Sequence, residues 1–172
     1  MERKQVWRWV FGPMAALAVI GVALVPVLPY ASGAVHNASV HAPNWALWDD
    51  LTRQTQIHVV AAMAALVIGT VILSLPKGRG PHKSLGWAWV VAMAVTAASS
   101  LFMTGLNGNA YSLVHVLTGW TIIALPMGVL AIRNRNVIAH RRAMTGIFLG
   151  GLVVAGALTF LPGRFMFSLF FG

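Results

Sequence analysis

IHVVAAMAALVIGTVILSL, residues 57–75, contains no lysine, arginine or acidic residue, and its only titratable side chain is His58. A helix of about 20 predominantly apolar residues is long enough to cross the hydrocarbon core of a bilayer. We expect a helix at about 51–75, which Pro76 ends because proline cannot continue a helix. The run therefore predicts a transmembrane helix.

Apolar runs of similar length recur along the chain. They lie at about 9–30, 81–104, 112–132 and 143–161. Together with 51–75, they predict an all-α integral membrane protein with five transmembrane helices. We expect the last four helices, within residues 51–162, to form an up-down four-helix bundle in a single transmembrane domain, residues 1–172.

The composition indicates the same class. Of 172 residues, 58% are hydrophobic and only 9% are charged, whereas soluble domains carry about 25% charged residues. The net charge of +9 does not predict nucleic-acid binding, because the basic residues stand in short clusters between apolar runs. The absence of cysteine excludes disulfides and thiolate metal sites. Three acidic residues are too few for paired-carboxylate hydrolysis or a calcium cage.

The positive charges predict the orientation. If five helices cross in alternation, the N-terminus and the turns at 77–83 and 133–142 share one side of the membrane. These segments hold ten of the twelve cations, namely Arg3, Lys4, Arg8, Lys77, Arg79, Lys83, Arg133, Arg135, Arg141 and Arg142. Cytoplasmic loops are enriched in lysine and arginine. We therefore expect a bacterial inner-membrane protein with a cytoplasmic N-terminus and a periplasmic C-terminus.

The first apolar run has a second interpretation. A basic start, an apolar run and small residues, here ASGA at 31–34, also form the pattern of a cleavable signal peptide. The run from Val10 to Tyr30 has 21 residues, which is longer than the apolar region of about 7–15 residues in signal peptides. We expect a retained helix, and cleavage stays open.

Four of the six histidines lie near the ends of the expected helices. His58 and His115 are near the outer ends of the second and fourth helices, and His82 and His140 open the third and fifth on the cytoplasmic side. Alternate helices of an up-down bundle are diagonal, so each face receives one pair of opposed imidazoles. Two imidazoles occupy both axial positions of a b-type haem, which suits electron transfer. The pattern predicts two haems with these four histidines as ligands.

Residues beside the histidines fit a porphyrin. Gly86 and Gly119 follow His82 and His115 by one turn and would let a flat ring approach the backbone. Cations for haem propionates are Arg53 and Arg164 outside, and Lys83, Arg141 and Arg142 inside. We expect electron transfer between a quinol or small reductant and a membrane or periplasmic redox partner. A homodimer is compatible with this interpretation.

Other interpretations stay open. A zinc or copper ion would find a nitrogen-rich outer site in His36, His41, His58 and His115 with Asp49 and Asp50. The two inner histidines, at basic helix starts, would instead bind lipid headgroups. The chain would then be a haem-free accessory or assembly subunit that packs against a larger complex.

Two segments resemble a large family of small bacterial membrane proteins of unknown function. PHKSLGWAWVVAMAVTAAS (81–99) contains His82-Lys83-Ser84-Leu85-Gly86, and IAHRRAMTGIFLGGL (138–152) contains His140-Arg141-Arg142-Ala143-Met144. They are similar to the family's His-Arg/Lys-x-x-Gly and His-Arg-Arg-x-Met motifs, over about residues 55–165. Lys83 and Ala143 replace the commoner arginine and tryptophan. The resemblance implies a four-helix membrane fold more than an activity.

The arrangement of the histidines also resembles the cytochrome b-561 class. That class is similar in having four core helices and two b haems, held by histidines on alternate helices near opposite faces. His58, His82, His115 and His140 match this order and sidedness. No further sequence motif matches, and the ascorbate-binding features of the class cannot be placed here. The resemblance implies two haems and no particular substrate.

Overall fold

The computed structural model describes residues 38–103, 113–162 and 164–171, and these residues form helices, turns and loops with no strand. The chain divides into two units, one running from Trp45 to Leu158 and the other comprising the residues before and after it. The described part of the chain is all-α, as predicted. The expected helix at 9–30 and the loop residue His36 lie outside the described residues.

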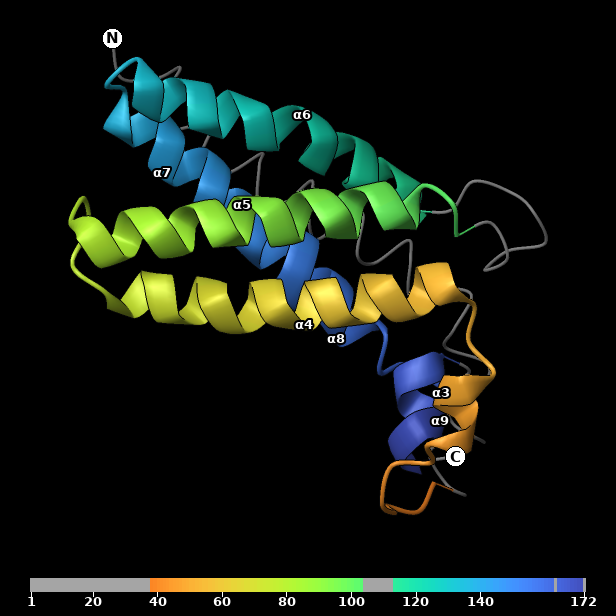
Figure 1. The fold of residues 1–172 in the computed structure, drawn as a ribbon. Coiled ribbons are helices and arrows are strands. Elements are labelled where there is room, and N and C mark those ends of the chain that lie inside the picture. The colour runs from red at the N-terminus through yellow and green to blue at the C-terminus, as the bar shows by residue number, and fades with distance from the viewer. Residues whose placement is uncertain (1–37, 104–112, 163, 172) are drawn as a thin grey trace, which may run out of the picture. The chain divides into compact units, whose positions relative to one another are not determined.

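Helices make up most of the unit from Trp45 to Leu158 (Figure 1). A short helix, α3 (Ala46–Asp49), precedes three long ones, α4 (Arg53–Ser74), α5 (Gly80–Ser100) and α6 (Leu113–Arg133). A last long segment consists of α7 (Val137–Gly146), the π-helix η1 (Ile147–Val154) and α8 (Ala155–Leu158).

The start of α4 and the turn between α4 and α5 follow from local chemistry. The Thr52 hydroxyl caps the start of α4 by accepting a hydrogen bond from Thr55 N at 3.3 Å. Gly78 takes a φ of 79°, which glycine adopts without strain. Pro81 occupies the first turn of α5, where a missing N–H costs nothing. The predicted helix at 51–75 is confirmed within two residues, whereas the one predicted at 81–104 ends at Ser100.

The last long helical segment begins earlier than the sequence predicted. The interpretation of 133–142 as a loop and of 143 as the helix start is wrong, because α7 starts at Val137. Asn136 caps this helix, and its side-chain oxygen accepts a hydrogen bond from Ala139 N at 3.0 Å. Arg135, with a φ of 59°, completes the reversal from α6. His140 therefore lies inside the first turn of a helix.

The four long segments pack in a closed circuit of contacts (Figure 1). α4 packs on α5, α5 on α6, and α6 on both α7 and η1, while η1 returns to α4. Segments that follow one another in the chain are therefore neighbours. α4 and α6 occupy alternate positions in the circuit, as do α5 and the segment from α7 to α8.

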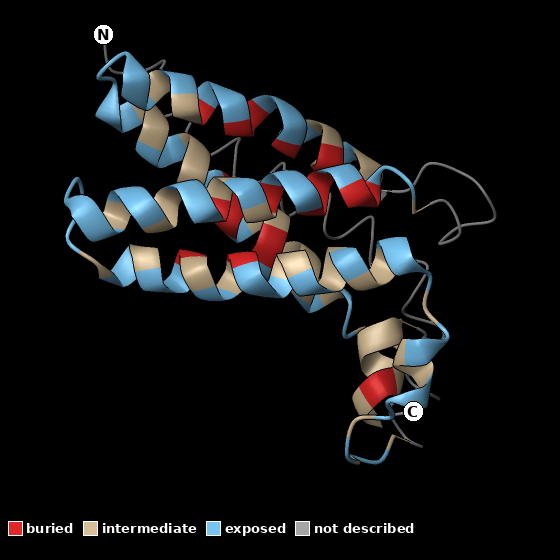
Figure 2. Cartoon of the chain, in the orientation of Figure 1, coloured by how far each residue is buried: buried red, intermediate tan, exposed pale blue. Residues whose placement is uncertain are grey.

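Buried residues lie along the middle of this unit (Figure 2), and the apolar ones among them form one cluster. The cluster consists of Ala65, Trp89, Met93, Ala124, Leu125, Ile147, Phe148 and Leu152. A Cβ at Gly69 of α4 would lie 2.6 Å from the Phe148 ring and 2.8 Å from Trp89 Nε1. The absence of a side chain at Gly69 thus lets both aromatic rings pack directly against the backbone of α4.

The helices expose apolar side chains and bury polar ones. On α4, exposed side chains recur every three or four residues at Ile57, Val60, Met63, Val67 and Val71. The buried polar side chains are Thr96, Ser99, Ser100, Thr118 and Thr121. A soluble bundle shows the reverse distribution, whereas a bilayer accepts apolar surface and forces polar groups to find partners inside the protein. The surface is therefore suited to lipid.

Among the residues that the structure describes, three helices are long and apolar enough to cross a membrane, namely Arg53–Ser74, His115–Arg133 and Val137–Leu158. α5 has a comparable length of 21 residues, but its basic first turn, two tryptophans and terminal serines lower its mean hydropathy. The membrane class is supported, and the predicted number of five crossings exceeds the three that hydropathy identifies here.

The other unit joins the segment before α3 to α9 (Phe165–Phe171). Two backbone hydrogen bonds connect them, His41 N to Phe170 O at 3.1 Å and Asn44 N to Leu169 O at 3.0 Å. These bonds satisfy carbonyl groups at the end of α9, which have no partner within the helix. Residues 41–44 are therefore held directly against the C-terminal helix.

We expect Gly69→Ala to destabilise the protein by about 1–3 kcal/mol, because the added methyl group displaces the Phe148 and Trp89 rings in a filled core. The matched control is Gly146→Ala, since nothing lies within 4 Å of a Cβ there and alanine is the better helix former. Thermal unfolding in detergent micelles, followed by circular dichroism, measures both variants. Equal stability would contradict the close packing at Gly69.

Candidate functional site

His58 lies in the second turn of α4 and is half-buried against α5. Its Nδ1 is 3.0 Å from the carbonyl oxygen of Thr96 and 3.2 Å from Ser99 Oγ. A carbonyl oxygen only accepts hydrogen bonds, so Nδ1 of the neutral ring carries the proton and Nε2 keeps a lone pair. The fold of α5 against α4 thus selects the tautomer that binds a metal through Nε2.

His140 is held in the same way at the opposite end of the helices. From the first turn of α7, its Nδ1 donates to the carbonyl oxygen of Gly128 at 2.9 Å. α6 and α7 approach closely here, because a Cβ at Gly128 would overlap the Met144 side chain and lie 3.0 Å from Ala143 Cβ. Gly128 therefore presents its carbonyl group to His140, and Nε2 again keeps a lone pair.

His82, which the sequence pairs with His140, lies in the first turn of α5, before the apolar part of that helix. Burial lowers the pKa of His82, and electrostatic interactions with His140 and Lys77 lower it further. The structure thus brings His82 and His140 into one electrostatic environment. Within the described residues, His82 Nδ1 is buried and has no hydrogen-bond partner.

His115 is half-buried at the start of α6. One turn further on, Thr118 Oγ1 is 2.7 Å from Ser100 Oγ of α5. Because Ser99 and Ser100 are consecutive, and Ser99 contacts His58, these contacts place the first turns of α6 at the level of His58. α4 and α6 also occupy alternate positions in the packing. That His58 and His115 share one iron atom stays a prediction.

A band of buried hydroxyl groups lies on α5 and α6 at this end of the helices, and sequence reasoning missed it. We call it the hydroxyl band: Thr96, Ser99, Ser100, Thr118 and Thr121. Thr96, Ser99, Ser100 and Thr121 each donate to a carbonyl oxygen three or four residues earlier on the same helix. The signal that would have found it is serine and threonine recurring at helical spacing inside apolar runs, where such residues pack between helices.

Open space lies beside the two glycines that the sequence assigned to a porphyrin. Gly86 and Gly119 are half-buried, and nothing lies within 4 Å of a Cβ at either position. The cations predicted for propionates in this unit are exposed, namely Arg53, Lys83, Arg141 and Arg142. Arg164 belongs to the other unit, and its role stays a prediction.

The predicted zinc or copper site receives no support from the described residues. Among them, no three histidine, aspartate or glutamate side chains form a group that would hold a metal ion. His41 Nδ1 is 2.7 Å from the carbonyl oxygen of Ala42, and Asp49 and Asp50 lie at the end of α3. His36 is outside the described residues. A haem with two imidazole ligands needs no such group.

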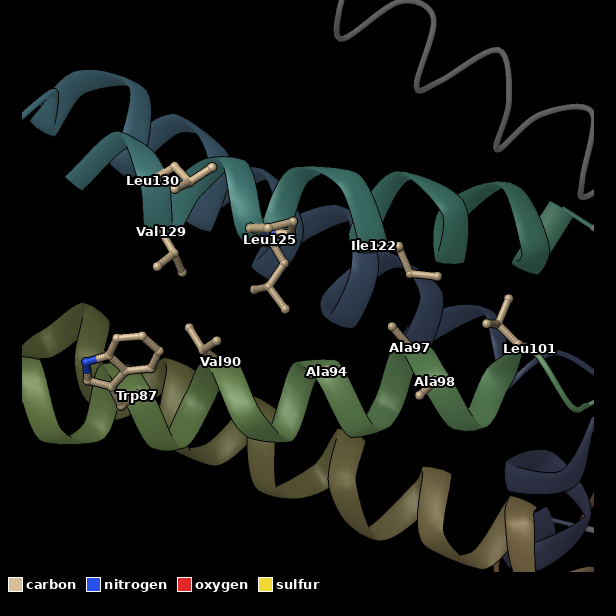
Figure 3. A pocket seen from close by; sticks show the side chains of 11 residues that line it. Trp87, Val90, Ala94, Ala97, Ala98, Leu101, Ile122, Leu125, Val129 and Leu130 are labelled. Carbon is tan, nitrogen blue, oxygen red and sulfur yellow. The ribbon is translucent and has the colours of Figure 1, made fainter. Parts of the chain in front are cut away.

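An apolar groove of about 540 Å³ runs between α5 and α6 (Figure 3). Small and branched side chains line it, including Ala94 and Ala98 of α5 and Ile122 and Val129 of α6. None of the four candidate histidines is among the lining residues. The groove is therefore separate from the spaces beside the histidines, and its apolar walls suit acyl chains.

Comparison with known proteins agrees with the membrane class. A family model described as "Predicted membrane protein (DUF2306)" matches residues 55–170. No curated protein and no solved structure matches the chain. The matched residues include the four candidate histidines, so these side chains lie within the part of the chain that the family model describes.

We expect nitrogen-15 NMR of histidine-labelled protein at pH 8 to show His58 and His140 protonated at Nδ1, because each presents that atom to a carbonyl oxygen. His58→Gln and His140→Gln assign the two signals by removing them. His41→Gln, which lies before α3, should leave both in place. A signal of an Nε2-protonated ring from either residue would contradict the hydrogen bonds described above.

Proposed function

We propose that this chain, which belongs to the DUF2306 family of predicted membrane proteins, is a b-type cytochrome that transfers electrons across the bacterial inner membrane through two haems. The proposed ligands are His58 with His115 near the periplasmic face and His82 with His140 near the cytoplasmic face. The proposed partners are a quinol or other small reductant and a redox partner on the opposite face. Because the function of the family is unknown, support comes from the residues of this chain.

The observation that carries the proposal is the anchoring of two imidazoles by main-chain carbonyl groups. His58 donates to Thr96 and His140 donates to Gly128, each through Nδ1. Histidines that ligate metals usually donate their other N–H in this way, which orients the ring and raises the basicity of Nε2. The two anchored rings lie at opposite ends of the helices, so each proposed haem has one of them. Bound haem would supply one-electron redox chemistry.

Other features support the same proposal. His82 and His140 share one electrostatic environment, and the lowered pKa of His82 favours the neutral ring, which alone has a lone pair for iron. Gly86 and Gly119 have open space beside them. The buried apolar cluster around Met93 lies between the two ends, which excludes water from the region between the proposed haems.

The hydrogen bonds between residues 41–44 and α9 support four crossings between these segments. Two segments joined by backbone hydrogen bonds lie on the same side of a membrane, so the number of crossings between them is even. The three spans identified by hydropathy would put them on opposite sides. α5 has the length to be the fourth, and its polar side chains Thr96, Ser99 and Ser100 are buried. We therefore include α5 in an up-down four-helix bundle, with the expected helix at 9–30 as the fifth crossing.

The absence of cysteine makes this topology directly testable with single cysteines. We expect Arg79→Cys and Asn134→Cys in intact cells to react only with a membrane-permeant maleimide, because both turns are cytoplasmic. Asp49→Cys should react with an impermeant maleimide. If α5 did not cross, Asn134→Cys would lie on the same side as Asp49→Cys and the two would show the same reactivity.

We expect the purified protein to show the reduced-minus-oxidised bands of low-spin b haem, with two haems per chain by the pyridine haemochrome assay. His58→Ala should remove about half of the haem, because one of two sites loses its anchored ligand. His41→Ala is the control and should retain both haems. A folded, monodisperse and colourless wild-type protein would contradict the proposal and favour the accessory subunit, for which metal analysis would then test zinc and copper.

A further inference from the structure

The two candidate ligands at the cytoplasmic end are not equivalent. His140 Nδ1 donates to Gly128 O at 2.9 Å, whereas His82 Nδ1 is buried without a hydrogen-bond partner among the residues described. Loss of such a partner weakens metal binding by an imidazole about 10–100-fold. We propose that His82 is the exchangeable ligand of the cytoplasmic haem and that a small neutral diatomic molecule, such as carbon monoxide, takes its place. This inference rests on the proposed function.

The backbone near His140 is also more tightly packed than the backbone near His82. His140 follows the Asn136 cap and stands beside the tight contact between Gly128 and Met144, so its position is fixed by α6. His82 follows a turn that contains Gly78 and Gly80, and nothing lies within 4 Å of a Cβ at either glycine. The turn before α5 therefore lacks the close packing that fixes the start of α7, and we infer that His82 can leave while α7 stays in place.

An apolar surface follows His82 on the same helix. Gly86 follows His82 by one turn, and nothing lies within 4 Å of a Cβ there. Trp87, the next residue, lines the apolar groove between α5 and α6 (Figure 3). The groove thus comes within one residue of Gly86 along α5, and its walls are apolar. Neutral diatomic gases are more soluble in such apolar surroundings than in water, whereas anions are not.

The charges near His82 also favour a neutral ligand. Lys77, which acts electrostatically on His82, donates its ammonium hydrogens to the carbonyl groups of Ile72, Leu73 and Leu75 at the end of α4. It is therefore occupied and does not offer an anion its hydrogen bonds. Exchange of a neutral imidazole for a neutral diatomic molecule leaves the charge of the site unchanged.

The test is carbon monoxide binding to the dithionite-reduced full-length protein in lipid nanodiscs, measured against haem content. In the wild type we expect about one of the two haems to bind carbon monoxide, in a phase limited by release of His82. His82→Ala should keep both haems, bind carbon monoxide to the same extent and bind it faster than the wild type, because no ligand must leave. His140→Ala, the matched control, should lose the cytoplasmic haem and its carbon monoxide signal.

Spectra and haem counts separate the outcomes. His82→Gly with added imidazole should regain the low-spin spectrum of the wild type, which a merely structural role of His82 does not predict. A cytoplasmic haem that is lost in His82→Ala but retained in His140→Ala overturns this inference and leaves the proposed function standing. Two haems that both resist carbon monoxide in wild type and in His82→Ala also overturn it. A wild-type protein without haem overturns the proposed function itself.

Discussion

The structure depends on one constraint, that the hydrocarbon core of a bilayer offers no hydrogen bonds. Each polar group within it must find its partner inside the protein. The hydroxyl band meets this constraint by bonding to carbonyl groups of its own helices, and the Ser100–Thr118 bond adds a contact between α5 and α6. His58 meets it through the carbonyl oxygen of Thr96. The bond that satisfies His58 Nδ1 also leaves Nε2 with its lone pair. One hydrogen bond therefore both replaces the lost water around the ring and fixes its tautomer.

A backbone carbonyl group can accept a hydrogen bond from a histidine of a neighbouring helix only where the two helices approach closely. Gly128 removes the side chain that would separate α6 from α7, and its carbonyl oxygen then reaches His140. Gly69 plays the corresponding part in the core, where Trp89 and Phe148 pack against α4. Among the residues that the structure describes, no carbonyl group reaches His82 Nδ1, and α5 begins there after a turn that contains Gly78. The difference between the two inner histidines therefore follows from how tightly each helix start is packed.

Much of the fold was predictable because it depends on local properties. The lengths of the apolar runs placed α4 and α6 nearly where the structure has them. The start of α7 was predicted wrongly, since the basic residues Arg141 and Arg142 suggested a loop, whereas the Asn136 cap extends the helix back to Val137. In a sequence, one capping residue such as Asn136 is a weaker indication of a helix start than two adjacent charged residues are of a loop.

By itself the sequence determined the membrane class, the approximate helices, the charge asymmetry and the positions of four histidines near helix ends, because hydropathy and charge act over short stretches. Only the tertiary structure decided which of these histidines are anchored. His58 and Thr96 are 38 residues apart in the chain, and His140 and Gly128 are 12 apart on different helices. These contacts depend on the packing of one helix on another. Every residue has a backbone carbonyl group, so the sequence does not indicate which carbonyl group accepts the hydrogen bond.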